Sequence, residues 1–74
     1  MSDENYNVIV NKVVNANDED ISNNIDEPTI MNYIGYASSL GKIVEDKLPN
    51  HYIADLSDDD YNLKIYFEVF VTAS

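Results

Sequence analysis

Carboxylates are the residues of this sequence whose type and spacing could do chemistry. The chain of 74 residues has 14 Asp and Glu against 4 Lys and no Arg, which gives a formal net charge of −10. Eleven of the acids fall into short groups, and these are the candidate partner-binding residues: Asp18, Glu19, Asp20, Asp26, Glu27, Glu45, Asp46, Asp55, Asp58, Asp59 and Asp60. This charge favours a basic partner. It disfavours direct binding to nucleic acid or to an anionic membrane, since both need clustered Lys and Arg.

The spacing within two of these groups suggests what the carboxylates imitate. In an extended chain, residues two apart are separated by about 6.6 Å. Neighbouring phosphates along a nucleic-acid strand lie at a distance of the same order. We therefore predict that Asp18 with Asp20, and Asp58 with Asp60, mimic phosphate pairs. The competing interpretation is that acidic loops only keep the domain soluble.

The sequence predicts neither an enzyme nor a cofactor or metal site. It has no Cys, which excludes thiol catalysis, disulfides and Cys-ligated zinc. Asp58, Asp60 and Asn62 match the start of a calcium loop, but Leu63 and Val69 stand where that loop needs Gly and Glu. The single His has no partner pattern, and so small a chain leaves little room for a secluded cleft.

The alternation of apolar residues predicts the elements that position these acids. We expect a strand over 5–14, a long acidic loop over 15–27, a short strand over 51–56, a turn over 57–60 and a long strand over 61–72. Ile21 and Ile25 are the large apolar residues of the acidic loop, and we expect them to anchor it to the core.

A helix is predicted over about 28–47. Asp26, Glu27 and Pro28 are typical of a helix start. Gly35 and Gly41 would each cost this helix about 1 kcal/mol relative to Ala. Glu45 and Asp46 would lie near its C-terminus, against the helix dipole, at a cost of a few tenths of a kcal/mol. The apolar face follows spacings of three and four: Ile30, Tyr33, Ile34, Ala37, Leu40, Val44 and Leu48.

These elements predict one small α+β domain over residues 1–74. The chain order is β-α-β-β, with a mainly antiparallel sheet of spatial order 1-3-2 and the helix on one face. The uncovered face would carry Tyr66 and Phe70. Two aromatic side chains beside polar residues on this face favour a homodimer.

In size, charge, lack of Cys and Arg, and the tracts 17–20, 26–27 and 58–60, the chain resembles the small acidic DNA-mimic proteins with which bacteriophages inhibit host DNA-binding proteins. The resemblance is compositional and spans the whole chain. It implies competitive occupation of a basic DNA-binding surface, with the bacterial nucleoid protein HU as the favoured target. It also implies action in the host bacterial cytoplasm or nucleoid, consistent with a sequence that lacks Cys and an apolar leader.

Two other functions remain open on the sequence alone. The first is a small regulatory protein-interaction module that binds through the apolar sheet face of Tyr66 and Phe70, with the acids serving solubility. The second is a domain that binds divalent ions.

Overall fold

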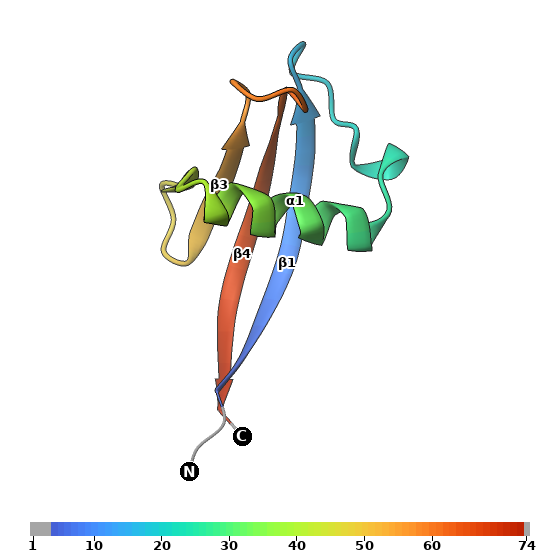
Figure 1. Cartoon of the computed structure of the whole chain (residues 1–74). Coiled ribbons are helices and arrows are strands. Elements are labelled where there is room, and N and C mark those ends of the chain that lie inside the picture. The colour runs from blue at the N-terminus through green and yellow to red at the C-terminus, as the bar shows by residue number, and fades with distance from the viewer. Residues whose placement is uncertain (1–3, 74) are drawn as a thin grey trace.

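The chain forms one antiparallel sheet with a single α-helix across one face (Figure 1). The computed structural model describes the backbone of residues 4–73 and the side chains of residues 6–71. The sheet has the strand order β1-β4-β3-β2, and every neighbouring pair is antiparallel. The elements are β1 (Glu4–Asn15), the short 3-10 helix η1 (Ser22–Asn24), α1 (Glu27–Ser39), β2 (Ile43–Glu45), β3 (His51–Leu56) and β4 (Leu63–Ala73).

The predicted α+β class, with one helix on one face of an antiparallel sheet, is confirmed. β4 lies between β1 and β3, as expected for the three predicted strands. The predicted order 1-3-2 is nevertheless incomplete, because β2 adds a fourth strand at the edge beside β3. β2 comes from residues that were predicted to be helical.

The helix is shorter than predicted because it ends at Gly41. Leu40 is the last residue with helical dihedral angles, and Gly41 has φ of 70°. The amide of Gly41 donates to the carbonyl of Ser38 (3.0 Å), and the amide of Lys42 donates to that of Ala37 (2.8 Å). This pair of bonds is the Schellman motif, in which a left-handed residue closes the last turn. Gly41 is therefore the helix terminator and not a costly interior residue.

Three consequences follow for residues assigned to the helix from the sequence. Leu40, Val44 and Leu48 continue the spacing of four by coincidence, and all three are exposed. Glu45 is the last residue of β2 and Asp46 follows it. The predicted opposition between these two acids and the helix dipole therefore does not exist.

The core lies between α1 and the sheet face beneath it. α1 supplies Ile30 and Ala37, and the sheet supplies the other buried members: Val13, Ala54, Leu56, Leu63, Ile65 and Phe67. Ile21 and Ile25 pack against this cluster half-buried, which confirms that they anchor the acidic loop.

A β-bulge explains why apolar and polar residues do not alternate strictly along β1. The register with β4 shifts between Val10 and Lys12, so that Asn11 is an extra residue. The shift lets Val8 and Val10 pack on the core before the bulge and Val13 after it. Without it, Val13 would point to the opposite face of the sheet.

We predict opposite effects for the two Gly→Ala substitutions of this chain. A Cβ at either Gly41 or Gly35 would meet no atom within 4 Å, so sterics do not separate them. Gly41→Ala should destabilise the protein by about 1–2 kcal/mol because an L-residue is strained in the left-handed region. Gly35→Ala, inside α1, should stabilise it by about 0.5–1 kcal/mol. Urea unfolding of the two variants beside the wild type measures both, and effects of equal sign would contradict the helix end described here.

Candidate partner-binding surface

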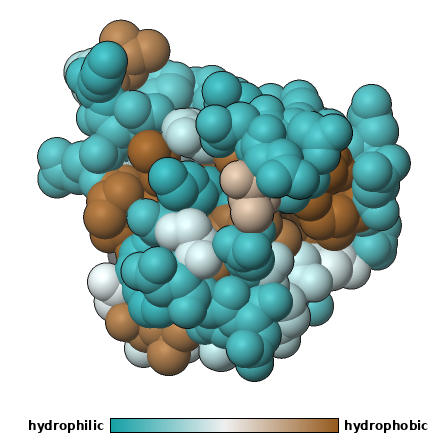
Figure 2. Space-filling model, turned by 90° about the horizontal axis from the view of Figure 1, so that it is seen from above, coloured by the Kyte–Doolittle hydropathy of each residue, from teal (hydrophilic) through white to brown (hydrophobic). Residues whose placement is uncertain are grey.

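Two acidic turns lie side by side at one end of the sheet. The turn after β1 and the turn between β3 and β4 are adjacent because Asn15 pairs with Leu63, and Leu63 pairs with Leu56. Both turns are at the top of Figure 1, and Figure 2 views this end from above, where hydrophilic surface predominates. We call this surface the acidic end, and its carboxylates are those of Asp18, Glu19, Asp20, Asp58, Asp59 and Asp60.

The first turn is closed by the side chain of Asn15. Its Oδ1 accepts hydrogen bonds from the amides of Asn17 (2.9 Å) and Glu19 (3.0 Å). The amide of Asp18 donates to the carbonyl of Asn15 (3.0 Å), and Asp18 itself has φ of 61°. The backbone is thus a compact turn. Asp18 lies in this turn, and Asp20 follows it in a β-bridge with Val14. That the two carboxylates are spaced like neighbouring phosphates stays a prediction.

Asp20 leaves this turn with its carboxylate already engaged. Its Oδ1 accepts hydrogen bonds from the hydroxyl (2.7 Å) and the amide (2.9 Å) of Ser22. The hydroxyl bond, followed by the amide bond, lowers the pKa of Asp20 from its ordinary value. Asp20 therefore stays ionised while it fixes the start of η1.

The second turn is also compact. The amide of Asp59 donates to the carbonyl of Leu56 (3.1 Å), the amide of Asn62 donates to that of Asp59 (3.0 Å), and Asn62 has φ of 54°. Asp58 and Asp60 lie on either side of Asp59 in this turn, and the phosphate-like spacing of their carboxylates stays a prediction. Both of these carboxylates are exposed to solvent.

Asp59 and Tyr61 attach this turn to the helix. The hydroxyl of Tyr36 donates to Oδ2 of Asp59 (3.2 Å), and this hydrogen bond raises the pKa of Tyr36. The ring of Tyr61 lies 4.8 Å from that of Tyr33 and 5.6 Å from that of Tyr36, measured between centroids. Tyr61 was predicted to begin the last strand. It belongs instead to an aromatic contact that orients the acidic turn.

Among the described residues, no Lys forms an ion pair with a carboxylate of the acidic end, although the charge of Lys12 helps to lower the pKa of Asp20. Among the side chains of residues 6–71, the one ion pair joins His51 to Glu68 (3.5 Å) and involves no Lys. Lys64 lines the hollow between the two turns, and the ammonium of Lys12 lies 4.6 Å from the ring centroid of Tyr66 on the sheet face that α1 leaves open. The exposed carboxylates of Asp18, Asp58 and Asp60 are therefore available to an external cation.

The other five candidate residues lie elsewhere. Asp26 and Glu27 start α1, where Asp26 accepts a hydrogen bond from the hydroxyl of Thr29 (2.6 Å) and makes no side-chain cap. Glu45 and Asp46 lie at β2, on the sheet edge opposite to β1. Asp55 lies in β3, before the second turn. The structure thus gathers six of the eleven candidates into one surface.

The open sheet face is the surface without α1. Tyr66 and Phe70 both lie on it, with Tyr66 half-buried and Phe70 40% exposed. Sequence reasoning missed the exposed apolar members of this face, Ile9 and Val44, which the strand register places beside Glu68 and Ile53. Ile9 was noted only as a break in the alternation, and Val44 was assigned to the helix.

Within residues 4–73, no group of three His, Asp or Glu side chains is placed to hold a metal ion. The same residues contain no helix that is both long and apolar enough to cross a membrane. Comparison with known proteins finds no matching protein-family model, no matching curated protein and no matching solved structure.

We predict a pH-dependent contribution of Asp55 to stability. Its carboxylate accepts hydrogen bonds from the hydroxyl and the amide of Ser57, and these bonds lower its pKa from the ordinary value of 3.8, with further help from Lys64 and Lys42. A depressed folded-state pKa adds stability above the unfolded-state value, and this stability is lost as the pH falls through the folded-state value. Asp55→Asn should therefore lower the melting temperature at pH 7, and the difference should shrink as the pH falls below 3.8 through the folded-state pKa.

Asp58→Asn is the matched control, since Asp58 is exposed and lies in the turn that Asp55 precedes. It should leave the melting temperature at pH 7 nearly unchanged. A deficit of Asp55→Asn that persists undiminished at about pH 3 would show that the charge of Asp55 is not its source.

Proposed function

We propose that this protein is an acidic DNA mimic, which occupies the basic DNA-binding surface of another protein and blocks its access to DNA. The observation that carries the proposal is the acidic end. It joins two turns from different parts of the chain, and no described lysine forms an ion pair with its carboxylates.

Availability of charge is the physical basis of the proposed competition. A carboxylate that is already paired with Lys gains little from a partner's cation. Three carboxylates of the acidic end, those of Asp18, Asp58 and Asp60, are exposed and lie in turns that backbone and neighbouring side chains close. The backbone that carries them is held in place without the use of their own oxygens. Because these turns are already folded, binding costs little further loop entropy.

The net charge of −10 adds a long-range component. It steers a cationic protein toward the acidic surface and raises the association rate, an effect that falls with ionic strength. The favoured target is the nucleoid protein HU in the host bacterial cytoplasm or nucleoid, and this choice rests on the resemblance to phage DNA mimics.

A competition assay tests the proposal. The protein is titrated into labelled duplex DNA bound to HU, and in parallel to unrelated basic DNA-binding proteins, at low and at physiological salt. We expect near-stoichiometric release of DNA from one member of the panel at physiological salt. Weak release from every member that vanishes with salt would show an ordinary polyanion and contradict the proposal.

A charge-matched pair of variants locates the surface. The triple variant Asp18→Asn, Asp58→Asn, Asp60→Asn should weaken competition by about 10- to 100-fold, since three exposed ionic contacts contribute about 0.5–1 kcal/mol each. Asn suits the φ of 61° at position 18, so the first turn should persist. The control variant Asp26→Asn, Glu45→Gln, Asp46→Asn removes the same amount of charge away from the acidic end. It should weaken competition with DNA by less than about threefold. Equal losses in both variants would assign the effect to net charge alone.

The alternative function, an interaction module that binds through the open sheet face, is favoured by the exposure of Ile9, Val44 and Phe70. Tyr66→Ala distinguishes the two functions in the same assay. A DNA mimic should retain its competition, because Tyr66 carries no charge and lies on the open sheet face, outside both acidic turns. Loss of binding in Tyr66→Ala together with full activity of the triple variant would support the alternative.

A further inference from the structure

The outer edge of β1 is free over part of its length. β1 pairs with β4 on one side and has no strand on the other. Near its C-terminal end this edge is covered, since the amide of Ile21 donates to the carbonyl of Val13 (2.7 Å) and the amide of Asn15 to that of Glu19 (3.0 Å). No segment within residues 4–73 forms a bridge to the outer side of Val8 or Val10.

The main-chain groups of Val8 and Val10 point toward this free edge. The amide of Val69 donates to the carbonyl of Asn50 (2.9 Å) on the β3 side, so it points away from β1. Val8 is opposite Val69 and is therefore in a pair that exchanges no hydrogen bonds, which turns its own N–H and C=O outward. Val10, opposite Phe67 and two residues further on, has the same orientation.

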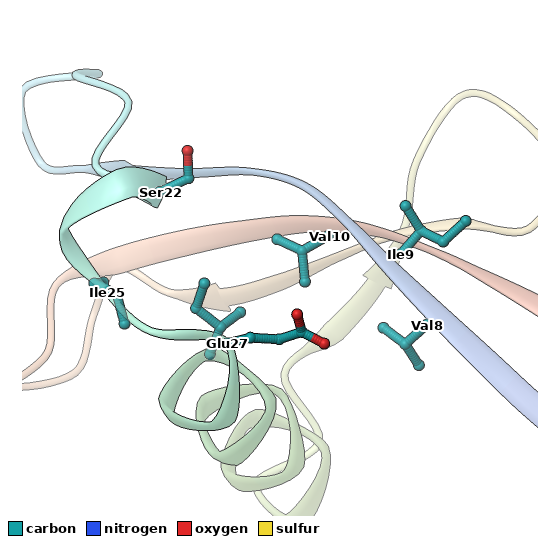
Figure 3. Close-up of a pocket in the computed structure, with 7 residues that line it drawn as sticks. Val8, Ile9, Val10, Ser22, Ile25 and Glu27 are labelled. Atoms are coloured by element: carbon teal, nitrogen blue, oxygen red, sulfur yellow. The ribbon is translucent and has the colours of Figure 1, made fainter.

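A cleft runs along this same edge (Figure 3). It has a volume of about 420 Å³ and lies between β1 and the segment that leads into α1. Figure 3 shows the side chains of Val8 and Val10 on the helix side of the strand, and the carboxylate of Glu27 reaching toward them from the first turn of α1. The lining residues are Val8, Ile9, Val10, Ser22, Ile25, Glu27 and Ile30.

We propose that this edge and cleft bind an extended, basic peptide segment of a partner protein, which adds to the sheet as a fifth strand beside β1. The outward N–H and C=O groups of Val8 and Val10 offer it four main-chain hydrogen bonds. Alternate side chains of an added strand face the helix side, so one apolar side chain enters the cleft. Cationic side chains two residues away on the same face reach Glu27.

Charge complementarity selects a basic segment over a second copy of the chain. Among the described residues that line the cleft, Glu27 is the only charged one. Asp26 precedes it in the chain. Pairing two β1 edges would bring together two chains of net charge −10, which repel each other. The proposal goes beyond DNA mimicry because it uses a surface separate from the acidic end.

The probe is the peptide Thr-Lys-Thr-Ile-Thr-Lys-Thr, acetylated and amidated, titrated into the ¹⁵N-labelled full chain. The central Ile and both Lys share one face of the peptide when it is extended. We expect saturable shifts of the amides of Val8 and Val10. A peptide of equal charge with N-methylated amides on its bonding edge should bind at least about tenfold more weakly, because it cannot complete the main-chain bonds.

Two protein variants complete the test. Val8→Pro removes the outward N–H of Val8 without touching the hydrogen bonds to β4, and it should abolish saturable binding while the melting curve stays cooperative. Glu27→Gln should weaken binding about threefold or more. The triple variant of the acidic end should bind the peptide within about threefold of wild type, which separates this site from the proposed competition with DNA.

Three results would overturn the proposal. Equal affinity for the N-methylated and unmodified peptides would reduce the interaction to nonspecific charge attraction. Shifts centred on the acidic end instead of β1 would place the peptide on the other surface. Sedimentation that shows a dimer of the free chain, lost in Val8→Pro, would assign the edge to a second copy.

Discussion

The structure depends on the burial of one sheet face beneath one short helix. α1 has 13 residues, and only two of them, Ile30 and Ala37, are buried. A core this small leaves little stability in reserve, since hydrophobic burial is the main favourable contribution to folding. Three local features at the margin of the core therefore contribute to its stability. The β-bulge turns Val13 inward, Gly41 ends the helix, and Ile25 holds the loop against the core.

The acids of this protein divide into two kinds by what their oxygens contact. Asp20, Asp55 and Asp59 accept hydrogen bonds from side chains of neighbouring or distant residues and so close turns or attach them to the helix. These carboxylates offset part of the cost of like-charge repulsion, because bonds to the ionised form stabilise it. Asp58 and Asp60 are carried by the same turn at exposed positions. The structural acids thus hold the exposed acids in place.

The two proposed surfaces would bind their partners through different physical interactions. At the acidic end, exposed carboxylates provide charge, which acts at long range and is screened by salt. At the free edge of β1, main-chain hydrogen bonds and an apolar cleft provide short-range contacts that salt affects little. Ile21 separates the two surfaces. The hydrogen bond from its amide to the carbonyl of Val13 covers the C-terminal part of the β1 edge and leaves the part beside Val8 open.

The sequence by itself determined strands β1, β3 and β4, the start of the helix and the anchoring of the acidic loop. Alternation in β1 and β4 and the signals of Asp26 and Pro28 are local, so they can be recognised without knowledge of contacts. The helix end was predicted wrongly although Gly41 is a local signal, because Val44 and Leu48 imitate the helical spacing. Their exposure and the pairing of β2 with β3 are visible only in the folded chain.

The candidate binding surfaces were likewise determined partly by the sequence and partly by the tertiary structure. The acidic tracts are evident in the sequence, but their conformation depends on hydrogen bonds of Asn15 and Asp59 that the spacing of acids does not reveal. That the two tracts share one end of the sheet follows from the pairing of strands distant in the chain. The cleft beside β1 combines residues from β1, η1 and α1, and the outward direction of its main-chain groups is set by the register with β4. Only the tertiary structure decided the position of the acidic end and the formation of the cleft, because strand register and loop packing depend on the whole core and not on any one segment.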